Sequence, residues 1–125
     1  MTRKLNVLLV DDNKHFLKAM RFLLETSCCD ILDSIFIAND GIECLDILNK
    51  QQIDVIFMDI EMPRMNGIDA TRMVTSEFRD IKVIAVSFHS DEQYLINIIE
   101  AGAKNFISKS KINKEKIREV LVKFD

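Results

Sequence analysis

Five polar side chains stand directly after short apolar segments of this sequence. They are Asp11, Asp12, Asp59, Ser87 and Lys109. The apolar segments are short and rich in β-branched residues, which is typical of buried strands. In open α/β sheets, ligands bind beyond the carboxyl ends of the strands. We therefore expect the five side chains to converge at one edge of a sheet.

Three carboxylates at one edge would repel each other, and each would raise the pKa of its neighbours. A hard divalent cation compensates for this, and Mg²⁺ takes oxygen ligands and keeps several waters. We expect Asp12 and Asp59 to bind Mg²⁺ directly, together with the backbone carbonyl of Glu61. Asp11 should act on the metal mainly through a water.

The remaining carboxylate oxygen of Asp59 could then act as a nucleophile, since carboxylates form covalent phosphoryl intermediates. A transferring phosphoryl group needs its charge neutralised. Mg²⁺ and Lys109 would do this, and Ser87 would donate a hydrogen bond, each charge-assisted bond contributing roughly 1.5–3 kcal/mol. Each residue alone has an ordinary explanation as a turn, a cap or a solvated side chain. The complete set favours a site.

The segments that must position these side chains alternate between strand-like and helix-like patterns of apolar residues. Strands are expected at residues 5–10, 31–37, 55–58, 82–86 and 105–108. Helical patterns follow each strand, beginning after Asn13, at Gly41, at Gly67, at Ser90 and near Asn113. Strict alternation predicts a parallel sheet with right-handed crossovers and helices on both faces.

Apolar positions at helical spacing predict which side chains these helices bury. They are Phe16, Met20, Leu23 and Leu24; Gly41, Cys44, Leu45 and Leu48; Ala70, Val74 and Phe78; Tyr94 or Leu95 with Ile98 and Ile99; and Ile117, Val120, Leu121 and Phe124. Gly102 should end the fourth helix in the left-handed conformation that glycine adopts readily. The single proline, Pro63, lies in the loop after Asp59.

Composition restricts the class of protein. The chain has 125 residues, of which 48% are apolar and 30% charged, so we expect one globular domain spanning residues 1–125. A net charge of −3 does not suggest bulk attraction to nucleic acid or to a membrane, although the segment from Lys104 onward is basic. Three cysteines without framework spacing indicate a reducing compartment, and there is no signal-peptide or membrane-spanning segment. We expect a cytoplasmic protein.

Four motifs together resemble the receiver domain of two-component response regulators. They are Val10-Asp11-Asp12, the run from Met58 to Gly67, Val86-Ser87, and the run from Gly102 to Lys109. The resemblance covers essentially the whole chain. It implies a flavodoxin-like (βα)5 fold with strand order 2-1-3-4-5.

The resemblance also implies a function. Asp59 would accept a phosphoryl group from a sensor histidine kinase or a phosphotransfer protein, with Mg²⁺ as cofactor. Ser87 and Phe106 would form the switch that changes the face made by the fourth helix, fifth strand and fifth helix. The domain would assist its own phosphorylation and dephosphorylation without being a turnover enzyme, and a homodimer could form on phosphorylation.

Other residues near the motifs refine this expectation. Glu61 and His89 lie two residues beyond Asp59 and Ser87, so they should modulate the rate of dephosphorylation. Lys109 is followed by Ser110 where the family often has proline, and Phe88 stands where the family commonly has a small residue. The missing proline, the segment from Ser87 to Glu92 and the segment from Asp69 to Arg72 resemble the subgroup usually fused to a LuxR-type helix-turn-helix. Contact with DNA would need that additional domain.

Three other functions fit part of the pattern. A Mg²⁺-dependent phosphohydrolase resembling haloacid dehalogenases would use Asp59 as nucleophile, but it usually has a second Asp where this chain has Glu61. A flavodoxin needs a hydroxyl- and glycine-rich phosphate loop, and residues 11–14 are Asp-Asp-Asn-Lys instead. A receiver that only docks would not need the complete set of five residues.

Overall fold

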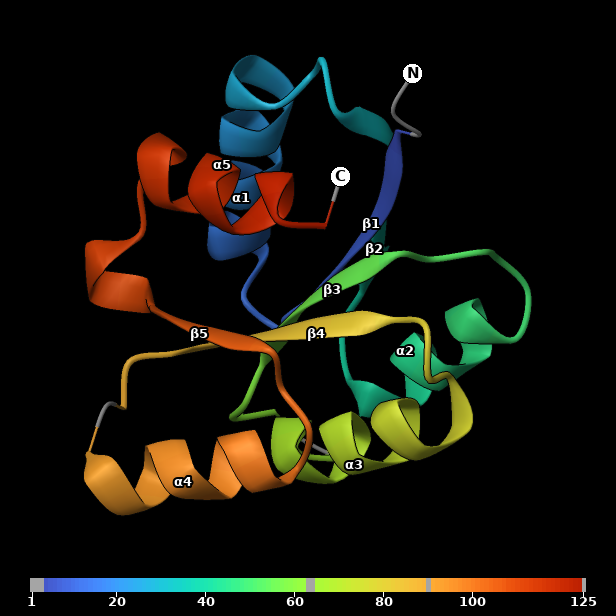
Figure 1. Ribbon diagram of the computed structural model, residues 1–125, viewed down its shortest axis with the longest axis vertical. Helices are drawn as coiled ribbons and strands as arrows, with labels where there is room; N and C mark the ends of the chain where they lie inside the picture. The colour runs from blue at the N-terminus through green and yellow to red at the C-terminus, as the bar shows by residue number, and fades with distance from the viewer. Residues whose placement is uncertain (1–3, 63–64, 90, 125) are drawn as a thin grey trace.

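The computed structural model describes residues 4–62, 65–89 and 91–124. Its centre is a five-stranded parallel sheet in the order β2-β1-β3-β4-β5 (Figure 1). The strands are β1 (Leu5–Val10), β2 (Leu32–Ala38), β3 (Val55–Asp59), β4 (Lys82–Ser87) and β5 (Asn105–Ser108). The expected strand order and parallel pairing are confirmed, and each expected strand lies within one residue of its observed limits.

Helices cover both faces of the sheet. They are α1 (Lys14–Ser27), α2 (Gly41–Leu48), α3 (Gly67–Glu77), α4 (Glu92–Glu100) and α5 (Lys114–Val122), with a short 3-10 helix, η1 (Lys109–Lys111), after β5. Helices α1 and α5 lie on one face, while α2, α3 and α4 lie on the other (Figure 1). The fold is therefore the doubly wound sandwich expected from the alternation of strands and helices.

Strand β3 is buried at every residue, and it shows how the sheet divides the core. Because successive side chains of a strand point to opposite faces, Phe57 packs with α1 and α5, whereas Ile56 and Met58 pack with α2 and α3. Parallel sheets covered on both faces read as continuous apolar runs. This explains why residues 55–58 lack any alternation of polar and apolar residues.

Polar caps fix the point at which each α-helix leaves its loop. The capping residues are Asn13, Asp40, Asn66, Asp91 and Asn113, and each accepts a backbone N–H of the following first turn. Loss of such a cap typically costs about 1 kcal/mol. Helices α1 to α4 each follow a strand with only a loop between them, and a cap ends each of these four loops. The caps therefore help to fix the loops at the carboxyl edge of the sheet.

Helix α4 packs less tightly than expected. Ile99 was predicted to be buried, but that prediction is wrong, because its side chain is 55% exposed. Of the α4 residues, only Ile98 is buried, with Tyr94 packing partly against the same cluster. The helix lies beside α3 toward the β5 edge of the sheet (Figure 1), so it presents a narrow stripe to the core. In α1, Leu17 is buried, which the expected stripe omitted.

The other boundaries agree with expectation. Gly102 has φ of 112°, the left-handed conformation predicted for the end of α4. A side chain there would also collide with Thr75 of α3. No cis peptide bond occurs among the described residues, so the Lys109–Ser110 bond is trans. Pro63 and the expected helix start at Ser90 lie outside the described residues.

Candidate functional site

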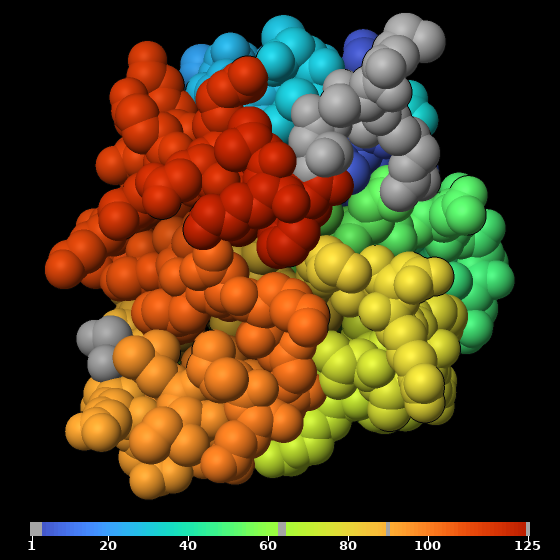
Figure 2. Space-filling view, in the orientation of Figure 1, coloured from blue at the N-terminus to red at the C-terminus, as the bar shows by residue number. Residues whose placement is uncertain are grey.

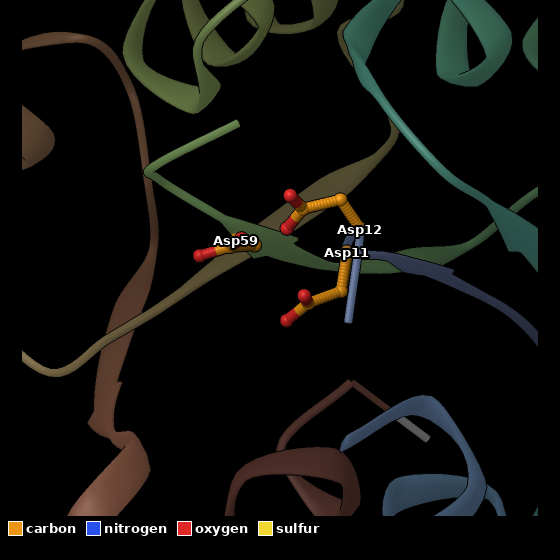
Figure 3. A group of neighbouring side chains, drawn as sticks. All are labelled: Asp11, Asp12 and Asp59. Atoms are coloured by element: carbon orange, nitrogen blue, oxygen red, sulfur yellow. The ribbon is translucent and has the colours of Figure 1, made fainter. Parts of the chain in front are cut away.

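Asp11, Asp12 and Asp59 meet at the carboxyl edge of the sheet, at the ends of adjacent strands. Val10 of β1 pairs with Met58 of β3, so the next residue on each strand is an aspartate. Each of the three residues offers a carboxylate oxygen within 4.8 Å of the others. Figure 3 shows the three side chains gathered where the two strands end. The predicted cluster of carboxylates therefore exists, with Asp11 and Asp59 buried and Asp12 exposed.

Lys109 brings a positive charge to this cluster. Its Nζ lies 2.7 Å from Oδ2 of Asp11 and 3.4 Å from Oδ1 of Asp59, and its side chain is only 8% exposed. The residue begins η1, directly after β5, so the sheet register and the 3-10 turn together set its position. One ammonium group partly compensates two buried carboxylates, which leaves negative charge in excess.

This excess shows in the acidity of Asp59. Burial, followed by the charge of Asp11, raises the pKa of its carboxyl from 3.8 to about 6. Lys109 and the backbone N–H of Glu61, which donates to Oδ1 at 3.3 Å, act in the opposite direction. The carboxylate form is a better nucleophile, so any added cation that favours ionisation would also favour attack by Asp59.

The donor set fits a hard divalent cation. Oδ2 of Asp11 is buried and accepts no hydrogen bond from the described residues, although the Lys109 ammonium lies 2.7 Å from it. Such an atom normally finds a partner. Three carboxylates with one exposed member suit Mg²⁺, which binds a few carboxylates and keeps waters. Glu61, whose backbone carbonyl was expected as a further ligand, lies in the loop directly after β3.

Ser87 lies on the other side of Asp59, at the end of β4. The preceding residue, Val86, pairs with Asp59 across the sheet. The Ser87 side chain is 1% exposed, and its Oγ accepts the backbone N–H of His89 at 3.0 Å. The nearby Tyr94 hydroxyl has a raised pKa, because burial and then the charge of Glu61 outweigh the opposite effect of Ser87. The Ser87 hydroxyl is therefore engaged by the loop that follows it.

His89 and Glu61, the two residues expected to modulate rate, contact each other. Nε2 of His89 lies 3.1 Å from Oε1 of Glu61. The His89 ring also stacks on Tyr94, with 5.2 Å between centroids and 12° between planes. The contribution of Tyr94 was missed, because its place in the apolar stripe of α4 indicated a core residue. Its hydroxyl was the only signal in the sequence for a polar partner.

Phe106, the second residue of the expected switch, is half-buried on β5. It packs against the core beneath α4 and also borders a surface groove of about 420 Å³ between β5 and α5. The ring thus lies between the core and solvent. Its rotation on phosphorylation stays a prediction.

The chain belongs to the response regulator receiver domain family, whose sequence profile matches residues 7–122. Among curated relatives, the transcriptional regulatory protein DegU of Brevibacillus brevis is 30% identical over 106 residues, covering 85% of this chain and 44% of that protein. The chain thus spans less than half the length of this relative.

Solved structures show the same fold. The chemotaxis protein CheY4 of Vibrio cholerae has a TM-score of 0.85 at 22% identity, covering 98% of this chain and 99% of that one. The receiver domain of the sensor histidine kinase PA1611 of Pseudomonas aeruginosa PAO1, solved with magnesium in its active-site cleft, has a TM-score of 0.83 at 22% identity, with 97% of each chain covered. In the described part of the chain, no helix has the length and apolar character that a membrane span requires.

Proposed function

We propose that Asp59 accepts a phosphoryl group from the phosphohistidine of a sensor histidine kinase or phosphotransfer protein. The observation that carries this proposal is the placement of a buried carboxylate beside Asp11, Asp12 and the Lys109 ammonium. Receiver family membership supports the same reaction. A carboxylate oxygen of Asp59 attacks phosphorus, the phosphorus–nitrogen bond to histidine breaks, and the imidazole leaves.

The residues of this chain have distinct parts in the transfer. Lys109 exchanges its contact with Asp59 for one with a phosphoryl oxygen, which neutralises developing charge. Ser87 releases the hydrogen bond that it accepts from the His89 N–H and donates to a second oxygen. Glu61 and His89 lie where they can orient or block the water that later hydrolyses the aspartyl phosphate.

Asp12, Asp59 and the Glu61 carbonyl would hold Mg²⁺, with Asp11 acting mainly through water. When bound, the ion supplies charge neutralisation for the phosphoryl oxygens. The magnesium in the PA1611 receiver supports the same choice of metal for this chain.

The signal would leave through α4, β5 and α5. In Figure 2 these elements form one continuous surface of the molecule. Movement of Ser87 toward the phosphoryl group would vacate space that Phe106 fills from β5, and this changes the surface beside α4. Phosphorylated chains could then form a homodimer or release an output domain.

The relatives support a proposal about the setting of the domain. DegU is a transcriptional regulator, which supports an output that binds DNA through a separate LuxR-type domain. We propose that residues 1–125 form one receiver domain that works in the cytoplasm as a phosphoacceptor rather than as a turnover enzyme.

Acetyl phosphate provides a direct test. With Mg²⁺ present, the intact mass should rise by one phosphoryl group, and Asp59→Asn should prevent the increase. Asp46→Asn, at an exposed position of α2, is a matched control that should label normally. Labelling of the Asp59→Asn chain, or labelling that is unaffected by a chelator, would contradict the assignment.

A further inference from the structure

The Lys109 ammonium faces two phenylalanine rings as well as two carboxylates. Its Nζ lies 4.5 Å from the centroid of the Phe16 ring and 5.6 Å from that of Phe88. Phe16 belongs to α1, whereas Phe88 directly follows Ser87 in the loop after β4. Two separate segments thus place aromatic faces against one buried cation.

These rings fill a need created by burial. An ammonium has three N–H donors, and the described structure offers it one short carboxylate contact, to Asp11, and one longer contact, to Asp59. Its side chain is nearly removed from water. The negative face of an aromatic ring attracts a cation, and the attraction is stronger where water is excluded. The rings therefore replace part of the lost hydration.

The exposure of Phe88 makes its position informative. Its side chain is 68% exposed, so burial in the core does not explain where the ring lies. The ring has two alternative explanations: contact with Lys109, or steric obstruction of the approach to Asp59. Ser87, the last residue of β4, directly precedes Phe88, so a movement of Ser87 toward a phosphoryl group also moves the Phe88 ring relative to Lys109.

We infer that Phe16 and Phe88 are positioning residues that hold the Lys109 ammonium over Asp11 and Asp59 before a phosphoryl group arrives. A lysine side chain is flexible and loses freedom when it binds. Holding the ammonium in place beforehand reduces that loss, so a phosphoryl group should bind more tightly. This inference rests on the proposed function of Asp59.

The test compares substitutions that separate ring chemistry from bulk. Phe88→Leu keeps an apolar side chain without an aromatic face, whereas Phe88→Tyr keeps the ring. Affinity for beryllofluoride with Mg²⁺, a stable phosphoryl mimic, should fall about two- to fivefold in Phe88→Leu, the factor expected for a partly exposed cation–π contact. Phe88→Tyr should restore it. Phe22→Leu, at another exposed phenylalanine on α1, should leave affinity at the wild-type value.

Two further measurements identify Lys109 as the residue affected. In NMR spectra of the unphosphorylated chain, ring currents should shift the protons at the end of the Lys109 side chain upfield. Phe88→Leu should reduce this shift, and Phe16→Leu should reduce it further, because the Phe16 ring is closer. In a Lys109→Met background, Phe88→Leu should have no additional effect on beryllofluoride affinity.

The outcomes separate this inference from the proposed function. If wild type binds beryllofluoride and Phe88→Leu binds it equally or more tightly, the ring acts as an obstruction and the positioning role is rejected. If wild type does not bind beryllofluoride, the proposed function fails, and the Lys109 resonances alone decide the inference. Resonances that stay unchanged in both leucine variants would then overturn it.

Discussion

The side chains of His89 and Glu61 meet 3.1 Å apart, and this contact joins the loop after β4 to the loop after β3. Both side chains are more than half exposed, so the pair should contribute little to folding stability. The position of the pair is more informative than its stability, since Glu61 is two residues beyond Asp59 and His89 is two residues beyond Ser87. We therefore expect the pair to lie next to the path that a hydrolytic water would take.

Breaking this pair should change the lifetime of the phosphorylated state more than the stability of the fold. We expect Glu61→Gln or His89→Ala to alter the dephosphorylation rate severalfold, while the free energy of unfolding changes by less than about 1 kcal/mol. Decay of the phosphorylated mass with time measures the first, and urea unfolding the second. Unchanged decay in both single variants would rule out a role for the pair.

Asp59 should make stability depend on pH in a defined direction. Its carboxyl has a pKa of about 6 in the folded chain and 3.8 ordinarily, so ionisation is harder when the chain is folded. The folded chain therefore has its full stability from this group below about pH 4 and loses it as pH rises through 6. The free energy of unfolding falls by about 3 kcal/mol over this range of pH.

Asp59→Asn tests this directly in the absence of Mg²⁺. At pH 8 the variant should be more stable than wild type by up to about 3 kcal/mol, and at pH 4 the difference should disappear. Urea unfolding across this range measures the effect, with Asp46→Asn as the control for loss of an exposed carboxylate. A difference that grows as pH falls would show that the sign is wrong.

Mg²⁺ should stabilise the folded chain through the acidic cluster. A ligand that binds only the folded state adds about 2.7 kcal/mol at a hundredfold excess over its Kd. The melting temperature of wild type should rise with Mg²⁺, and that of Asp12→Ala should respond much less. An equal rise in both proteins would exclude Asp12 as a metal ligand.

Tyr94 should hold Ser87 in its resting position. Tyr94→Phe keeps the ring that stacks on His89 and removes the hydroxyl, which we expect to form a hydrogen bond with Ser87. One hydrogen bond contributes about 0.5–1.5 kcal/mol, so the variant should be destabilised by that amount. Beryllofluoride affinity should rise about two- to tenfold, because Ser87 is released. Weaker binding would show that Tyr94 assists the activated state instead.

Phe106 should respond when Asp59 carries a phosphoryl mimic. NMR of the free and beryllofluoride-loaded chain should show the Phe106 ring and the amides from Ser87 to Ser110 shifting together. Burial of a phenylalanine contributes about 1.5–3 kcal/mol, enough to couple with the new bond at Ser87. Shifts confined to Asp11, Asp12 and the Asp59 loop would exclude the coupled switch.

The sequence predicts the sheet well, because buried parallel strands are continuous apolar segments that end at polar residues. Residues 55–58 illustrate this, and the aspartate that follows them falls at the expected place. Helix faces are harder to predict. Ile99 repeats at the correct spacing, but α4 touches the core along too narrow a stripe to bury it. The spacing of apolar residues predicts which face of a helix is apolar, but it does not predict how much of that face packs against the core.

Contacts between loops could not be predicted for a similar reason. The contact of Glu61 with His89, and of His89 with Tyr94, depends on three segments that meet only in the folded chain. The same holds for Lys109 between Phe16 and Phe88. Strand order brings these segments near each other, but side-chain rotamers decide which of them touch.

The parallel pairing of β1 with β3 also affects how the chain folds. Val7 pairs with Val55, and parallel strands cannot be joined by a tight turn. Forming such distant contacts first costs the entropy of closing a long loop, before the contacts themselves stabilise the chain. This slows folding. During synthesis, Asp11 and Asp12 therefore remain separated from Asp59 until β3 has left the ribosome. The repulsive carboxylates come together only when the central sheet is present to hold them.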